Sequence, residues 1–107
     1  MTAETREVRQ AKAWARAEAM HDAVTIARGH AAALRIVEQV RFVEMAQVQR
    51  AADEPRLHQR AHDLWCQAFD EAWGAYSLAN RLSEASHQES MTAYDVEMEC
   101  SDAEVAP

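Results

Sequence analysis

Only two glycines and two prolines interrupt this sequence of 107 residues, and one of the prolines is the terminal Pro107. Glycine and proline are the residues that most disfavour the interior of an α-helix, so their scarcity leaves few places where a helix must end. Ala, Glu, Gln, Arg, Leu and Met dominate up to about residue 88, and all of them are strong helix formers. The chain therefore favours long helices, and its length predicts a single domain.

Apolar residues at helical spacings predict three long helices, at about residues 3–28, 31–52 and 54–85. Gly29 marks the end of the first, either as a tight turn, which we favour, or as a bend within a continuous helix. Because the predicted connections are short, the helices are expected to pack antiparallel. We predict an all-α fold, an antiparallel helical bundle of three long helices followed by a short C-terminal helix or acidic tail.

Polar residues at the predicted helix starts support these boundaries. Thr2 is the predicted N-cap of the first helix, and Asp53 that of the third. Pro55 is tolerated in the first turn, where its missing N–H would have no partner in the helix. Gly74 lies inside the third helix and is expected to allow a close helix contact beside Trp73.

The large apolar residues of the second and third helices are expected to form most of the core. The second helix carries a broad stripe consisting of Leu34, Ile36, Val37, Val40, Val43 and Val48. The third carries an aromatic strip, which we expect to be mainly core and partly an interface, consisting of Trp65, Phe69, Trp73 and Tyr76.

All of the net charge of −7 lies in the last quarter of the chain. Acidic and basic residues are equal in number up to Arg81, and no Lys or Arg follows it. We therefore divide the chain into a helical bundle over 1–88 and an acidic C-terminal segment over 89–107. The charges after Arg81 come from Glu84, Glu89, Asp95, Glu97, Glu99, Asp102 and Glu104.

The conformation of residues 91–100 is ambiguous from the sequence. Apolar and acidic residues alternate from Tyr94 to Cys100, which is the period of a β-strand. Met91, Tyr94 and Met98 are also spaced by three and four residues, as on one face of a helix. We favour a short helix; the alternative is a segment that becomes ordered only when it binds.

This segment is the predicted binding site for a protein partner with a basic surface, because its charges would steer the partner and its apolar residues would anchor it. The alternatives are a solubilising end, or a clamp that pairs with arginines of the same or another copy: Arg28, Arg35, Arg50, Arg56 and Arg60. The predicted partner-binding residues are Glu89, Tyr94, Asp95, Val96, Glu97, Met98 and Glu99.

His58 and His62 are four residues apart on a predicted helix, so both imidazoles could reach one metal ion. No HExxH motif accompanies them, and they are weak candidates beside the ordinary interpretation as polar surface residues. Cys66 is expected to be a buried thiol; as a nucleophile it would need a base such as His62. We therefore expect no metal site, no cofactor and no catalytic residue.

These observations predict a small acidic non-enzymatic interaction protein. The low pI argues against direct nucleic-acid binding, no apolar run predicts a membrane span, and the polar start and two distant cysteines fit a cytoplasmic protein. One concrete form is a phage- or plasmid-encoded inhibitor of a nucleic-acid-handling complex, the type that anti-CRISPR proteins exemplify. The alternative is a helical metal-binding protein or small enzyme using His58 and His62. The thin core also makes a homodimer an expectation.

Overall fold

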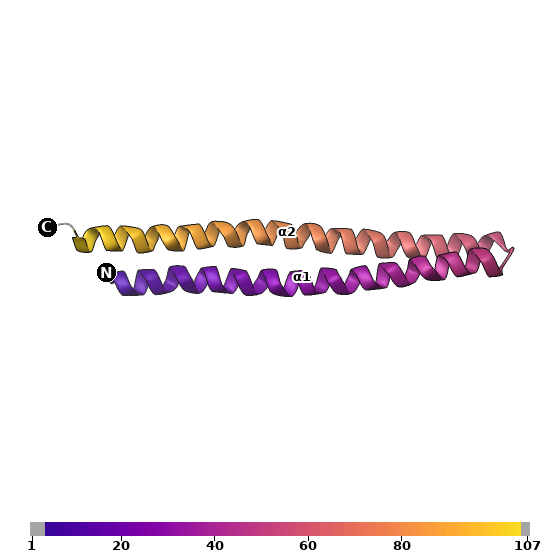
Figure 1. The fold of residues 1–107 in the computed structure, drawn as a ribbon, viewed down its shortest axis with the longest axis horizontal. Coiled ribbons are helices and arrows are strands. Elements are labelled where there is room, and N and C mark those ends of the chain that lie inside the picture. Colours follow the sequence, from indigo (N-terminus) through magenta and orange to yellow (C-terminus); the bar gives the residue numbers. More distant parts are fainter. Residues whose placement is uncertain (1–3, 106–107) are drawn as a thin grey trace. The chain divides into compact units, whose positions relative to one another are not determined.

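The computed structural model describes residues 4–105, and the side chains of residues 4–99. It contains two long helices, α1 (Arg6–Ala51) and α2 (Pro55–Val105), which pack against each other (Figure 1). The predicted all-α class is confirmed, and the described residues contain no strand. The prediction of three long helices is wrong, because the first two predicted helices are one helix.

Gly29 does not interrupt α1. The helix runs through it without a positive φ angle, and a side chain added there would meet nothing within 4 Å. A single glycine inside a helix costs only about 1 kcal/mol relative to alanine. The residues on both sides are good helix formers, so this cost does not end the helix. The tight turn that we favoured is therefore wrong, and the alternative of a continuous helix is correct.

The C-terminal segment is helical, as favoured, but it continues α2 instead of forming a separate short helix. The alternation from Tyr94 onward does not produce a strand, because α2 already extends into the segment from the N-terminal side. The polar run before it is also helical, and the Thr92 hydroxyl donates a hydrogen bond to the Gln88 carbonyl at 3.0 Å. This bond satisfies the hydroxyl inside the helix.

Both helix starts lie slightly later than predicted. The Thr5 hydroxyl oxygen accepts a hydrogen bond from the Val8 amide at 3.3 Å, so Thr5 caps α1. The predicted cap, Thr2, lies outside the described residues. In α2 the Glu54 carbonyl accepts the first backbone bonds, which puts Glu54 at the cap position instead of Asp53. Pro55 is the first helical residue, where its missing N–H is harmless.

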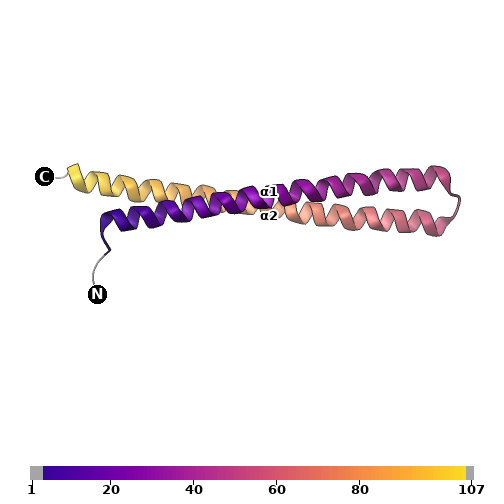
Figure 2. The same ribbon diagram turned by 90° about the horizontal axis from the view of Figure 1, so that it is seen from below.

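The chain forms two compact units, each made of one stretch of α1 and one stretch of α2 that run antiparallel (Figure 2). Unit 1 comprises the described residues of Met1–Thr25 and Asn80–Pro107. Unit 2 comprises Ile26–Ala79, with the turn at residues 52–54.

Small side chains form the buried seam between the helices. The covered positions recur every seven residues, as in Ala17, Val24 and Ala31, which is the repeat of a coiled coil. Among the residues whose side chains are described, seven of the nine buried apolar ones are alanines. The set is Ala13, Ala17, Val24, Ala31, Met45, Ala61, Ala68, Ala79 and Ala93.

In unit 1 the seam is a cluster of Ala13, Ala17 and Ala93, against which Val96 packs. The carboxylate of Glu99 lies 3.5 Å from the guanidinium of Arg9 at the edge of this cluster. Both charged groups are largely exposed, so this pair contributes at most about 1 kcal/mol. Unit 1 is therefore held mainly by its alanine contacts.

In unit 2 the largest residue of the seam is Trp65, which is half-buried. Its indole N–H donates a hydrogen bond to Glu38 across the helices at 3.2 Å, and its ring meets Phe42 edge-on at a centroid distance of 5.9 Å. The other members of the predicted aromatic strip, Phe69, Trp73 and Tyr76, are exposed. For these three the prediction of a core position is wrong, because each unit has only one partner helix to cover α2.

Replacing Gly74 by alanine is expected to stabilise the protein by about 1 kcal/mol, the difference between the two residues inside a helix. The new methyl group would meet nothing within 4 Å, so the predicted close contact at Gly74 is absent and nothing opposes the gain. Urea unfolding followed by circular dichroism measures the change. A lower unfolding midpoint in the variant would show that an unrecognised contact uses the space.

Candidate interaction surfaces

The exposed apolar side chains are the main candidates for function, because the seam uses few of the large ones. Two surfaces stand out. One lies on α2 near its C-terminal end, in unit 1, and the other lies on α1 in unit 2. Each is built from residues of one helix, so its geometry is fixed by the helical repeat.

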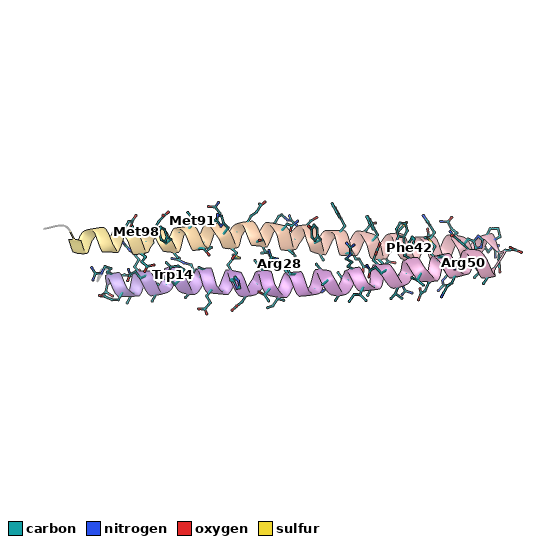
Figure 3. The ribbon with its side chains drawn as sticks, in the orientation of Figure 1. Trp14, Arg28, Phe42, Arg50, Met91 and Met98 are labelled. Atoms are coloured by element: carbon teal, nitrogen blue, oxygen red, sulfur yellow. The ribbon has the colours of Figure 1, made fainter. Side chains whose placement is uncertain are left out.

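The first surface, which we call the acidic face, lies on the side of α2 turned away from α1. Met91, Tyr94 and Met98 project there at spacings of three and four residues and are each about half exposed. Figure 3 shows Met91 and Met98 on α2 with Trp14 on the neighbouring stretch of α1. The exposed carboxylates of Asp95, Glu97 and Glu99 accompany this row on the same helix.

The predicted partner-binding residues separate into two groups. Tyr94, Asp95, Glu97, Met98 and Glu99 are exposed. The other two are at least half-buried at the seven-residue repeat of the seam: Glu89 and Val96.

Met91 completes the acidic face, although the predicted set of binding residues omits it. Its helical spacing to Tyr94 and Met98 was the signal that could have included it.

Within unit 1, Arg9 pairs with the acidic segment at Glu99. Arg9 is absent from the arginines predicted as competitors, because the pairing follows from the antiparallel register and not from local spacing. The five arginines predicted as competitors all lie in unit 2. Two of them, Arg56 and Arg60, line a shallow open hollow on α2 with Gln59, Asp63, Leu64 and Gln67. A hollow on one helix does not enclose a ligand.

The two candidate histidines have different neighbours. The His58 ring hydrogen-bonds to the backbone carbonyl of Ala52, in the turn that follows α1. The ring of His62 instead contacts Cys66, whose sulfur lies 3.7 Å from both ring nitrogens, and approaches Asp63 at 3.9 Å. Cys66 is half-buried and His62 is exposed. Within the described part of the chain, no three His, Cys, Asp or Glu side chains are grouped to hold a metal ion.

Lys12 lowers the pKa of a carboxyl group near the start of α1. Glu4 accepts a hydrogen bond from the Lys12 ammonium, and this bond and the positive charge lower the pKa of the Glu4 carboxyl. The group lies at the start of unit 1 and is exposed. Salt in the solvent therefore screens the ion pair of Glu4 and Lys12. Neither residue belongs to the acidic face.

The second surface, which we call the outer stripe, lies on the side of α1 turned away from the seam. It consists of Ile26, Gly29, Ala33, Ile36, Val40 and Val43, which follow one another at spacings of three and four residues.

Part of the outer stripe belongs to the stripe that the sequence predicts as core. In the structure Leu34 and Val48 are half-buried at the seam, but Ile36, Val40 and Val43 are exposed. The seven-residue repeat that places two such stripes on opposite sides of one helix was the signal that could have separated them.

No helix in the described part of the chain has the length and apolar character needed to cross a bilayer. No family model, curated protein or solved structure matches this chain.

Proposed function

We propose that this chain is a small non-enzymatic interaction module that binds a protein partner through the acidic face of α2. The observation that carries the proposal is the row of half-exposed Met91, Tyr94 and Met98 among carboxylates, on a helix whose opposite side is already packed.

This arrangement suits a helix that lies in a groove of another protein. Recognition of this kind uses apolar anchors at spacings of three, four and seven residues, which Met91, Tyr94 and Met98 provide. Methionine side chains are flexible and polarisable, so they adapt to an apolar groove. The partner surface that fits is therefore an apolar groove of about two helical turns.

The carboxylates beside this apolar row favour a partner groove with a positively charged rim. No Lys or Arg follows Arg81, so neither residue type lies near Asp95 and Glu97 in the sequence. Negative charge of this kind accelerates association with a positively charged surface and disfavours acidic partners. Proteins that handle nucleic acids carry such basic grooves. A concrete form of the proposal is an inhibitor, phage- or plasmid-encoded in the manner of anti-CRISPR proteins, that occupies the nucleic-acid groove of its target.

The test uses substitutions on the acidic face, because deleting residues 91–107 would also remove Val96 and Glu99 from the packing of unit 1. The tagged chain is used to capture its partner from a nuclease-treated bacterial lysate, and the affinity of the purified pair is then measured. Asp95→Lys with Glu97→Lys is expected to weaken binding about 100-fold, mainly through slower association. Met91→Ala with Met98→Ala is expected to accelerate dissociation.

The matched control is Asp70→Lys with Glu71→Lys, which reverses two exposed acidic residues elsewhere on α2. This variant has the same change in net charge as the variant of the acidic face. It should bind nearly as tightly as the unmodified chain, with a loss no larger than the change in net charge causes. Equal weakening by both charge reversals would assign binding to net charge alone. Unchanged binding in the variants of the acidic face would place the site elsewhere. Displacement of nucleic acid from the captured partner tests the inhibitor form directly.

A further inference from the structure

The outer stripe of α1 carries large apolar side chains that are exposed to solvent. Ile26 is 74% exposed, Ile36 62% and Val43 53%. A helix that packs on one neighbour normally presents polar residues on its opposite side. Here that side carries a second coiled-coil repeat, with spacings of three, four, three, four and three residues from Ile26 to Val43.

Charged residues avoid the stripe. The four that lie between Ile26 and Val43 occupy other positions of the helical repeat. Arg28 and Arg35 lie toward the seam side of α1 by that repeat, and Glu38 and Arg41 are half-buried at the seam itself. The stripe is flanked instead by residues other than Asp, Glu, Lys and Arg: His30, Ala32, Val37 and Gln39. A second helix could therefore approach without meeting a like charge.

The order of large and small residues fits a second copy of the same stripe. Suppose that two copies align antiparallel about a two-fold axis between residues 34 and 35. A residue of one copy then faces the residue of the other copy that lies equally far from the axis in the sequence, on its opposite side. Gly29 then faces Val40 of the second copy, and Ala33 faces Ile36. Each small residue meets a large one, as close packing requires, and a two-fold axis makes every contact twice.

The exposed area of the chain is consistent with an additional interface. The chain exposes 8251 Å², whereas a compact monomer of the same mass exposes about 6000 Å². A stable interface removes about 800 Å² from each partner. The excess is large enough to supply such an interface, and the outer stripe contributes exposed Ile36, Val40 and Val43 to it.

We propose that two copies of this chain form an antiparallel dimer through the outer stripe of α1, with Gly29 and Ala33 of each copy facing Val40 and Ile36 of the other. The dimer uses a helix and a unit different from those of the acidic face. It therefore stands or falls independently of the proposed function, and it would present two acidic faces to partners.

Cysteine cross-linking tests the register. In a full-length background of Cys66→Ser with Cys100→Ser, one chain carries Ile26→Cys and another carries Val43→Cys. In the proposed dimer these two positions face each other, whereas residue 26 of one copy lies about 25 Å along the axis from residue 26 of the other. Mild oxidation should therefore link the mixed chains and leave each variant alone unlinked. Linkage of the Ile26→Cys chain to itself would indicate a parallel pair and overturn the proposal.

Analytical ultracentrifugation tests the interface itself. The unmodified chain should sediment with the mass of two 12.1 kDa chains. Ile36→Glu with Val40→Glu should weaken association by about 100-fold or more, because unpaired carboxylates would be buried twice across the axis.

The control Leu78→Glu changes an exposed apolar residue of α2 in the same unit and should leave the mass unchanged. Circular dichroism establishes that all three chains remain helical. A monomer at all concentrations, or a dimer that the stripe substitutions leave intact, would overturn the proposal.

Discussion

An Ala93→Asp chain is expected to lose about 3 kcal/mol of the stability of unit 1, because it places an uncompensated charge in a buried apolar contact. Ala93 is 1% exposed and contacts the alanine cluster of α1. The Asp side chain is also larger than Ala, and the two helices are in contact through alanines at this position. Asp is in addition a poor residue for the middle of a helix. The paired stretches of unit 1 should therefore separate.

Hydrogen exchange resolved by segment measures this effect, because it reports on the two units separately. Amides of residues 80–99 should exchange faster in the variant, while those of unit 2 keep most of their protection. The matched control is Tyr94→Asp, which introduces the same residue at the next position, where the side chain is 53% exposed. Equal effects of the two substitutions would mean that the seam does not run through Ala93.

The sequence predicted the helical class correctly but misplaced the helix ends. Gly29 and the residues of the polar run at 86–90 are weak local signals, because each residue opposes the helix by about 1 kcal/mol or less. They lose to the strong helix formers on both sides and to packing along the seam. The turn at residues 52–54 persists because Pro55 cannot donate a backbone hydrogen bond to the preceding turn. A covalent restriction was therefore a better guide than a propensity.

The predicted core was wrong in a systematic way, because it followed residue size. Each unit pairs only two helices, so one stripe of each helix can be covered. The covered stripe is the alanine-rich one, and Ile36 and Trp73 remain outside. The repeat of seven residues through Ala17, Val24 and Ala31 is visible in the sequence. A core predicted from this repeat, instead of from the size and hydrophobicity of the side chains, would have identified the seam.

The candidate binding segment shows the same limit on a smaller scale. Composition identified residues 89–107 as acidic and partly apolar. It could not separate Val96, which packs against α1, from Met98, which faces outward. That distinction requires the register of α2 on α1, and Arg9 near Glu99 depends on the same register. Long-range pairing of this kind leaves no local trace in one sequence.

A Trp65→Ala chain is expected to lose about 3 kcal/mol of the stability of unit 2, toward the low end of the range for aromatic truncation because the ring is half-buried. The indole bridges the two helices through its hydrogen bond to Glu38 and its edge contact with Phe42. It also lies against Phe69 at a centroid distance of 5.9 Å. Truncation removes all of these contacts at a seam that otherwise consists largely of alanine.

Urea unfolding measures the loss, and Trp73→Ala provides a matched control with the same truncation on the same helix. Trp73 is 62% exposed and contacts Tyr76 of its own helix, so its loss should cost less than about 1 kcal/mol. Trp65→Phe should fall between the two, because it retains a ring but leaves the half-buried Glu38 without the indole donor. If Trp65→Ala were no worse than Trp73→Ala, the alanine contacts alone would hold unit 2, and the Glu38–Trp65 pair would serve to fix the register instead of adding stability.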